Sequence, residues 1–311
     1  MKKLLLFTLI FALVLYFPNN DYSHFFDISS KFALITKLDE NYVPQGISYL
    51  NNWIIISYYS NENNPSVLVI LDKNTGEFIK YLDIYFSNGK PYTGHAGGVT
   101  VSKKYVWISS DYHLYKIKLN DLVNTKSGDK IKIINSNEIP VKGAFVQYHN
   151  NHIWVGEFYH FYDYITNPKH RLINRKGTEY NAWITGFSLD ENENISSFEY
   201  ILSIPDIVQD IEFIDNYIVL SRSYGRKNDS ILEFYSNVLN EKPNKNINGI
   251  PLWFLDEPVK TINILPMSEG ITKIDNSLYI LFESAALKYI NSGKYPTKYI
   301  WKLNLEKLVL K

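Results

Sequence analysis

The chain has 311 residues, of which 45% are hydrophobic and 15% aromatic, and its 32 basic and 32 acidic side chains leave no formal net charge. So much apolar and aromatic area excludes an intrinsically disordered chain. The absence of cysteine excludes a disulfide scaffold, an iron–sulfur protein and a thiol enzyme. The balanced charge argues against nucleic acid as a partner, because surfaces that bind nucleic acid are basic.

The N-terminus starts with Lys2 and Lys3, followed by an apolar run over residues 4–17 that only Thr8 interrupts. A basic start, an apolar run and a polar exit are typical of a secretory signal. The run is short for a membrane-spanning helix, which needs about 20 residues, yet no clear cleavage site follows it. We therefore expect residues 1–18 to be a signal peptide or an uncleaved membrane anchor, residues 19–30 to be a linker, and the protein to be extracytoplasmic, either secreted or held at the membrane by this segment.

Five later segments share one pattern: a small or polar pair, a short alternating strand, a turn, and a strongly apolar strand. Their first strands start at Gln45, Gly97, Gly143, Gln209 and Glu269. Turns rich in Asn and Asp between such strands predict hairpins, because these residues tolerate the positive φ that tight turns require. Two further strands are expected after each hairpin except the fifth, which is followed only by a strand over 298–305.

A strand expected over residues 32–38, upstream of the first hairpin, supplies the strand that the fifth unit lacks. The sequence thus predicts an all-β fold, a five-bladed β-propeller over 31–311 whose N-terminal strand closes the last blade. A ring is favoured because a four-stranded blade cannot bury its faces alone. Two packed β-sandwiches, or a six-bladed ring with one degenerate blade, are the alternatives. Insertions at 159–181 and 236–257 are expected to form loops or short helices that shape one end of a monomeric ring.

Several strings carry a resemblance to a known family: PQGI (44–47), GHAGGV (94–99), LSRSYGR (220–226), MSEGIT (267–272) and LFESAA (281–286). On these motifs the chain resembles an uncharacterised family of secreted bacterial β-propeller proteins. The resemblance spans nearly the whole chain after the N-terminal segment, and it implies export and a propeller fold. More weakly, Glu269 followed by Gly270 is similar to the metal-binding glutamate of gluconolactonase-type propellers, which have six blades.

The starts of the first strands of a propeller face one mouth of its channel, where ligands usually bind. We therefore expect a polar central site, with ligand-binding roles for Gln45, His95, Gln209, Arg222 and Glu283, and catalytic roles for Glu157, Asp210 and Glu269. Glu157 and Glu269 are also candidate ligands of a metal ion. Oxygen donors without cysteine suit Ca²⁺. The alternative is that these groups are hydrated strand ends, with Arg222 paired to Glu283 or Glu157 and His95 bonded to the carbonyl of a neighbouring blade.

Three functions remain open at this point. The leading one is an exported module whose central site binds a small molecule or a cation. The second is a hydrolase of the lactonase or glycosidase kind acting at the same site, although the place where five-bladed glycosidases carry an inward Asp holds Gln45 here. The third is a scaffold that docks a protein partner through the insertion loops.

Overall fold

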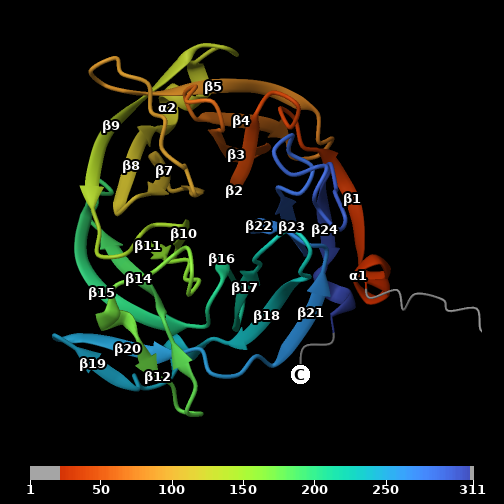
Figure 1. Ribbon diagram of the computed structural model, residues 1–311. Coiled ribbons are helices and arrows are strands. Elements are labelled where there is room, and N and C mark those ends of the chain that lie inside the picture. Colours follow the sequence, from red (N-terminus) through yellow and green to blue (C-terminus); the bar gives the residue numbers. More distant parts are fainter. Residues whose placement is uncertain (1–21, 309–311) are drawn as a thin grey trace, which may run out of the picture.

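The computed structural model describes residues 22–308. Over this range the chain is almost entirely β-structure, in several sheets that together form a propeller-like fold (Figure 1). Its helices are short: α1 (Ser23–Ile28), α2 (Leu119–Asn124), and the 3₁₀ helices η1 (Pro168–His170), η2 (Val238–Asn240) and η3 (Leu305–Lys307). Each helix in the described range lacks the length and apolarity needed to cross a membrane.

Each predicted hairpin begins a group of four strands, which we number 1 to 5 along the chain. Group 1 is β2 (Tyr42–Leu50), β3 (Trp53–Ser60), β4 (Val67–Asp72) and β5 (Phe78–Phe86), and group 2 is β6 (Gly98–Val101), β7 (Tyr105–Ser110), β8 (His113–Lys118) and β9 (Lys130–Glu138). Group 3 is β10 (Phe145–His149), β11 (His152–Gly156), β14 (Ala182–Leu189) and β15 (Ile195–Ile204), and group 4 is β16 (Val208–Ile214), β17 (Tyr217–Arg222), β18 (Ser230–Ser236) and β21 (Lys260–Ile264). Group 5 is β22 (Ser268–Ile274), β23 (Ser277–Phe282), β24 (Tyr299–Asn304) and, from the N-terminal part of the chain, β1 (Ser29–Leu34).

Neighbouring strands within every group are antiparallel, as tight hairpins require. The first strands of the groups contact one another in a closed order: β2 with β6, β6 with β10, β10 with β16, β16 with β22, and β22 with β2. Figure 1 shows these strands nearest the centre and the later strands of each group progressively further out. Residues far apart in the sequence therefore meet around one centre.

Glycine allows the first strands to approach one another closely. A Cβ atom on Gly46 of β2 would lie 2.5 Å from the backbone nitrogen of Val99, and one on Gly98 of β6 would lie 2.5 Å from that of Val146. Such a separation is below any van der Waals contact, so a side chain at either place would push neighbouring strands apart. Glycine is needed here because it has no Cβ, not for its backbone freedom.

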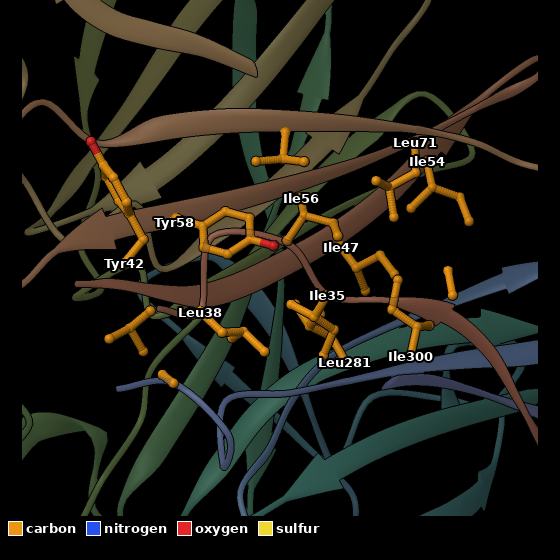
Figure 2. Close-up of a cluster of buried hydrophobic side chains, with 14 of the residues drawn as sticks. Ile35, Leu38, Tyr42, Ile47, Ile54, Ile56, Tyr58, Leu71, Leu281 and Ile300 are labelled. Carbon is orange, nitrogen blue, oxygen red and sulfur yellow. The ribbon is translucent and has the colours of Figure 1, made fainter. Parts of the chain in front are cut away.

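The N-terminal and C-terminal parts of the described chain meet in group 5, where β1 pairs antiparallel with β24. This strand spans Ser29–Leu34, earlier than the predicted 32–38. A buried apolar cluster then fills the space between groups 1 and 5, with Ile47 and Ile56 facing Leu281 and Ile300 (Figure 2). Burying such side chains stabilises the junction by roughly 2 kcal/mol each.

Residues 23–30, which we expected in a linker, instead form α1 and the start of β1. Phe25 and Ile28 are buried there against the apolar cluster between groups 4 and 5, so this segment belongs to the folded unit. The predicted signal or anchor at 1–18 lies outside the described residues.

The two insertions differ from each other in position. Residues 159–181 contain η1 and the short pair β12 (Leu172–Ile173) and β13 (Glu179–Tyr180). The second insertion forms η2, β19 (Lys245–Ile247) and β20 (Ile250–Phe254), and β20 pairs in parallel with β15. This second insertion therefore extends the outer edge of group 3, whereas we expected it at one end of the ring. A similar parallel pairing of β5 with β9 joins the outer edges of groups 1 and 2.

Candidate functional site

A cavity of about 760 Å³ lies where the five groups converge, and every group contributes to its wall. Five of the predicted ligand-binding or catalytic residues line it: Gln45, His95, Gln209, Glu269 and Glu283. A second hollow of about 310 Å³ lies between the outer strands β1 and β24, lined by residues such as Ser29 and Lys302. The large cavity is the better candidate because buried ionisable groups gather in its wall.

β-Bulges at the starts of three first strands direct side chains into this cavity. The pairing register shifts between Pro44 and Ile47 in β2, between Val208 and Asp210 in β16, and between Ser268 and Ile271 in β22. Gln45, Gln209 and Glu269 lie within these irregular stretches. A bulge breaks the strict alternation of a strand and re-aims a side chain, which explains why these three residues share the cavity wall.

The central feature of the wall is a pair of carboxyl groups, Glu269 from β22 and Glu283 just after β23. The two carboxyls are in hydrogen-bond contact with each other. Glu269 is buried and Glu283 is partly exposed to the cavity. Gln45 donates from Nε2 to Glu283 Oε2 at 3.4 Å, and Gln209 donates from Nε2 to Glu269 Oε1 at 3.2 Å. Amides from groups 1 and 4 thus orient two carboxyls of group 5.

Burial raises the pKa of both carboxyl groups, and their mutual repulsion contributes to the shift of Glu269. Lys288 and Arg226 act in the opposite direction on Glu283, because nearby positive charge favours its ionised form. Two carboxyls in contact cannot both ionise without repelling each other, so the pair retains a proton near neutral pH.

Beside the carboxyl pair, aromatic rings and cations alternate along the wall in what we call the aromatic–cation stack: His95, Tyr59, Lys288, Tyr289 and Arg226. His95 stacks on Tyr59 with ring centroids 4.4 Å apart. Lys288 Nζ lies 5.2 Å from the Tyr59 ring and 5.1 Å from the Tyr289 ring, and Arg226 lies 5.0 Å from the Tyr289 ring. Lys288 also donates to Tyr59 Oη at 2.8 Å. The stack holds two positive charges next to the carboxyl pair.

His95 faces the cavity rather than a neighbouring carbonyl, with its ring exposed on the cavity side. Its surroundings remove much of its water, and this desolvation lowers the pKa of the imidazole. The lowered pKa favours the neutral imidazole, which can both donate and accept a hydrogen bond.

Asp210, which we expected to be catalytic, lies outside the cavity between β16 and β22. Its Oδ1 accepts from the amide of Ile211 and its Oδ2 from the amide of Ile271, both at 2.8 Å. It occupies the strand position that Gly46 and Gly270 hold in their groups, one residue after the cavity-facing Gln or Glu. Asp210 therefore joins two first strands and has no free oxygen directed at a ligand.

Glu157 is fully buried and also lies outside the cavity wall. Its Oε2 accepts from His170 Nδ1 at 2.8 Å and from the amide of Trp183 at 3.2 Å. The His170 ring in turn stacks on Trp183 with centroids 3.9 Å apart. Glu157 thus fixes the first insertion, through η1, to group 3.

Arg222 is paired, as the structural alternative predicted, but with a partner we did not expect. Its Nη1 donates to Glu233 Oε1 at 2.6 Å, and its Nε donates to the carbonyl of Asp206 at 3.0 Å. The pair lies between the adjacent strands β17 and β18, so Arg222 has no role in the cavity wall.

The candidate metal ligands Glu157 and Glu269 lie in different surroundings, one behind the wall and one in it. Among residues 22–308, no group of three or more His, Asp or Glu side chains is placed to hold a metal ion. Carboxylate and amide oxygens at the pair would suit Ca²⁺ by chemistry, and the number of side chains that converge there is small for an ion that takes six to eight ligands.

The sequence patterns identify only His95 among the residues of the aromatic–cation stack. Signals for the others were present: Tyr59 follows a predicted strand end, Arg226 ends the LSRSYGR string, and Lys288 and Tyr289 follow LFESAA. Tyr59 lies near the end of β3, and the other three lie on loops, whose paths no hydrophobic periodicity specifies.

No family model matches the chain. Two curated proteins of Dictyostelium discoideum, probable polyketide synthases 39 and 33, are each 23% identical to it in an alignment of 188 residues that covers 49% of this chain and 6% of theirs. Among solved structures, Myxococcus xanthus glutaminyl cyclase matches 89% of this chain and 92% of its own at 8% identity, with a TM-score of 0.45. A Trichoderma reesei protein of carbohydrate-active enzyme family AA12 matches 89% and 95% at 9% identity, also with a TM-score of 0.45. The chain spans only 6% of the length of the curated relatives, and at these similarities the function must be argued from the site.

Proposed function

We propose that the chain is a five-bladed β-propeller that binds a small polar organic molecule in its central cavity. Groups 1 to 5 are the blades, and the pairing of β1 with β24 closes the last one. The closed order of contacts among the five first strands supports this assignment. Closure also removes an exposed sheet edge, which would otherwise invite pairing with other chains.

The observation that carries the function is the carboxyl pair of Glu269 and Glu283 in the cavity wall. Burying two carboxyls side by side is costly, and a protein that needs only stability does better with apolar side chains there. Gln45 and Gln209 hold the pair in place. A site that maintains such a pair against its cost is built to contact a ligand.

The charges of the wall favour an uncharged ligand. Three cations line the cavity, Lys142, Arg226 and Lys288, together with the carboxyl groups of Asp111, Asp163, Glu269 and Glu283. With one proton shared by the pair, the four carboxyl groups carry three negative charges, which balance the three positive ones. The carboxyl pair offers both a donor and an acceptor, and aromatic rings offer apolar faces, a combination that suits a polyol, a sugar or a lactone.

The test is a thermal-shift and saturation-transfer NMR screen with a panel of neutral monosaccharides and lactones, and with CaCl₂ in a separate arm. We expect at least one neutral probe to bind wild type and to lose its binding in Glu283→Gln and Tyr59→Ala. The matched control is Glu199→Gln, at a partly exposed carboxyl on β15 that lies outside the cavity wall, and this variant should bind the probe as wild type does. If only Ca²⁺ raises the melting temperature of wild type, and this effect is lost in Glu269→Gln, then the cavity binds a cation and not an organic molecule.

A docking function is the second candidate, favoured by exposed aromatic residues on the first insertion. Phe161 and Tyr162 are 65% and 77% exposed, and Tyr164 nearby lines the cavity. If no probe binds and Phe161→Ser with Tyr162→Ser abolishes an association that the cavity variants keep, the insertion rather than the cavity is the functional surface.

We propose further that the propeller works outside the cytoplasm, as the basic and apolar character of residues 1–18 predicts. Fractionation of cells that express the full chain, with N-terminal sequencing of the product, distinguishes a cleaved signal from a retained anchor. Recovery of the intact chain in the cytoplasm would contradict export.

A further inference from the structure

We propose that Glu269 and Glu283 form a catalytic acid–base pair that hydrolyses a carboxylic ester or lactone entering the central cavity. This inference rests on the proposed function, because the substrate must occupy the same cavity as the ligand. It assigns the reaction to two residues of one blade instead of the trio Glu157, Asp210 and Glu269 that the sequence suggested.

The contact between the two carboxyl groups selects the reaction class. Retaining glycosidases hold their two carboxyls about 5–5.5 Å apart and inverting glycosidases about 6.5–9.5 Å apart, because a sugar carbon, or a sugar and a water, must fit between them. Glu269 and Glu283 are in direct hydrogen-bond contact. That arrangement is too close for glycoside cleavage, and it suits two carboxyls that share one proton and act together on a water molecule and a carbonyl group.

The surroundings give the two carboxyls different tasks. Glu269 is buried and close to Asp210, conditions that favour its neutral form. Glu283 is partly exposed to the cavity and feels Lys288 and Arg226, which favour its ionised form. The proton therefore resides on Glu269, and the carboxylate that meets cavity water is Glu283.

The step balances without a further reactant. The oxygen of a water molecule attacks the acyl carbon while its proton passes to the Glu283 carboxylate, and the proton of Glu269 passes to the carbonyl oxygen, which gives a neutral tetrahedral diol. Glu269 then takes a proton back from one hydroxyl as the carbonyl reforms. The bond from carbon to the alkoxy oxygen breaks, and Glu283 returns its proton to the departing oxygen. The products are an acid and an alcohol, joined in one molecule when the substrate is a lactone, and the pair regains its starting state.

Neighbouring residues position this chemistry. The amide of Gln45 donates to one oxygen of Glu283 and that of Gln209 to one oxygen of Glu269, which orients both carboxyl groups. The neutral imidazole of His95 and the ring of Tyr59 lie along the same wall. A cavity of about 760 Å³ admits a lactone of monosaccharide size together with the attacking water.

The experiment measures hydrolysis of γ- and δ-lactones by pH-stat and of short-chain 4-nitrophenyl esters by absorbance, with binding of each probe followed by thermal shift. We expect hydrolysis by wild type and by the control Glu199→Gln, and a loss of about 100-fold or more in kcat for Glu269→Gln and Glu283→Gln. Circular dichroism establishes that each variant is folded. The wild-type pH profile provides a second readout that needs no variant: activity should rise as the pair loses its first proton and fall as it loses its second.

The outcomes separate the two proposals. A probe that binds through the carboxyl pair and is not hydrolysed leaves the binding function intact and overturns the catalytic inference. Hydrolysis that persists in both Gln variants also overturns it, because another group then acts. If no probe is bound or hydrolysed by wild type across the panel, both proposals fall.

Discussion

The carboxylate of Asp210 accepts a hydrogen bond from the backbone amide of Ile271 at 2.8 Å, and this bond joins the first strands of two neighbouring groups. The other oxygen of Asp210 accepts from its own neighbour, Ile211. A residue that resembled a catalytic acid in the sequence is thus part of the ring that holds the cavity together. We therefore expect its removal to affect folding before it affects chemistry.

Asp210→Ala should lower the free energy of unfolding by about 2–4 kcal/mol, because two buried amides lose their acceptor. Asp210→Asn should cost less, since its side-chain carbonyl still accepts one of them. Denaturant unfolding measures the difference, with Asp39→Ala as a control at an exposed carboxyl. A cost for Asp210→Ala no larger than the control's would show that the strands do not depend on this bond.

Glu212, two residues along β16, should make stability depend on pH. Burial raises its pKa from 4.5 to about 7, although it accepts hydrogen bonds from the amides of Phe213 and Lys273. The folded protein therefore binds more protons than the unfolded chain between these pH values, so stability falls as the pH rises from about 4.5 to 7. At the acid end of this window, the raised pKa of Glu212 contributes roughly 3 kcal/mol to the free energy of unfolding.

Glu212→Gln removes this titration, and the comparison isolates it from other groups. The difference in unfolding free energy between wild type and Glu212→Gln should change across this window, in favour of wild type at the acid end. Parallel pH curves for the two proteins would show that Glu212 titrates alike in the folded and unfolded states.

Gly98→Ala should destabilise the protein by about 3 kcal/mol or prevent folding, because the added Cβ would lie 2.5 Å from the backbone nitrogen of Val146. Gly293→Ala is the matched control, since a Cβ there meets its nearest atom at 3.6 Å, an ordinary contact. Thermal unfolding of both variants measures the difference in their stability. Equal melting temperatures would mean that β6 and β10 are not packed as closely as described.

Lys288→Met should raise the pKa of Glu283, because the positive charge of Lys288 favours the ionised carboxylate. If the protein is an enzyme, the acid limb of its pH–activity profile should therefore also shift to higher pH in this variant. Lys132→Met, which removes an exposed charge on β9, is the control. An unchanged titration in Lys288→Met would show that the aromatic–cation stack does not act on the carboxyl pair.

The hairpins were predictable because each carries its own local signals, such as Asn51 and Asn52 between two apolar strands. The pairing of an N-terminal strand with β24 was also predictable, from the strand that the last unit lacks. In the sequence, Gln209 and Asp210 are equally plausible cavity residues, since both start a first strand. A bulge, which alternation cannot reveal, directs Gln209 inward and leaves Asp210 to the neighbouring strand.

The partners of the charged residues were the least predictable part. Arg222 pairs with Glu233 of the adjacent strand and Glu157 with His170 of the insertion, contacts that depend on strand register and loop path. Glu269 and Glu283 were both assigned to the site, yet nothing in their spacing indicated that the two carboxyls touch.

The central claim is that Glu269 and Glu283 retain a shared proton near neutral pH, and ¹³C NMR of the glutamate side-chain carboxyl carbons tests it most directly. Resonances assigned with Glu269→Gln and Glu283→Gln should titrate in two linked steps, with Glu283 near pH 7 and Glu269 well above its ordinary range, and each single variant should shift the step of the remaining carboxyl. Two independent titrations near the ordinary glutamate value of about 4.3 would contradict the shared proton, and with it the chemistry assigned to the cavity.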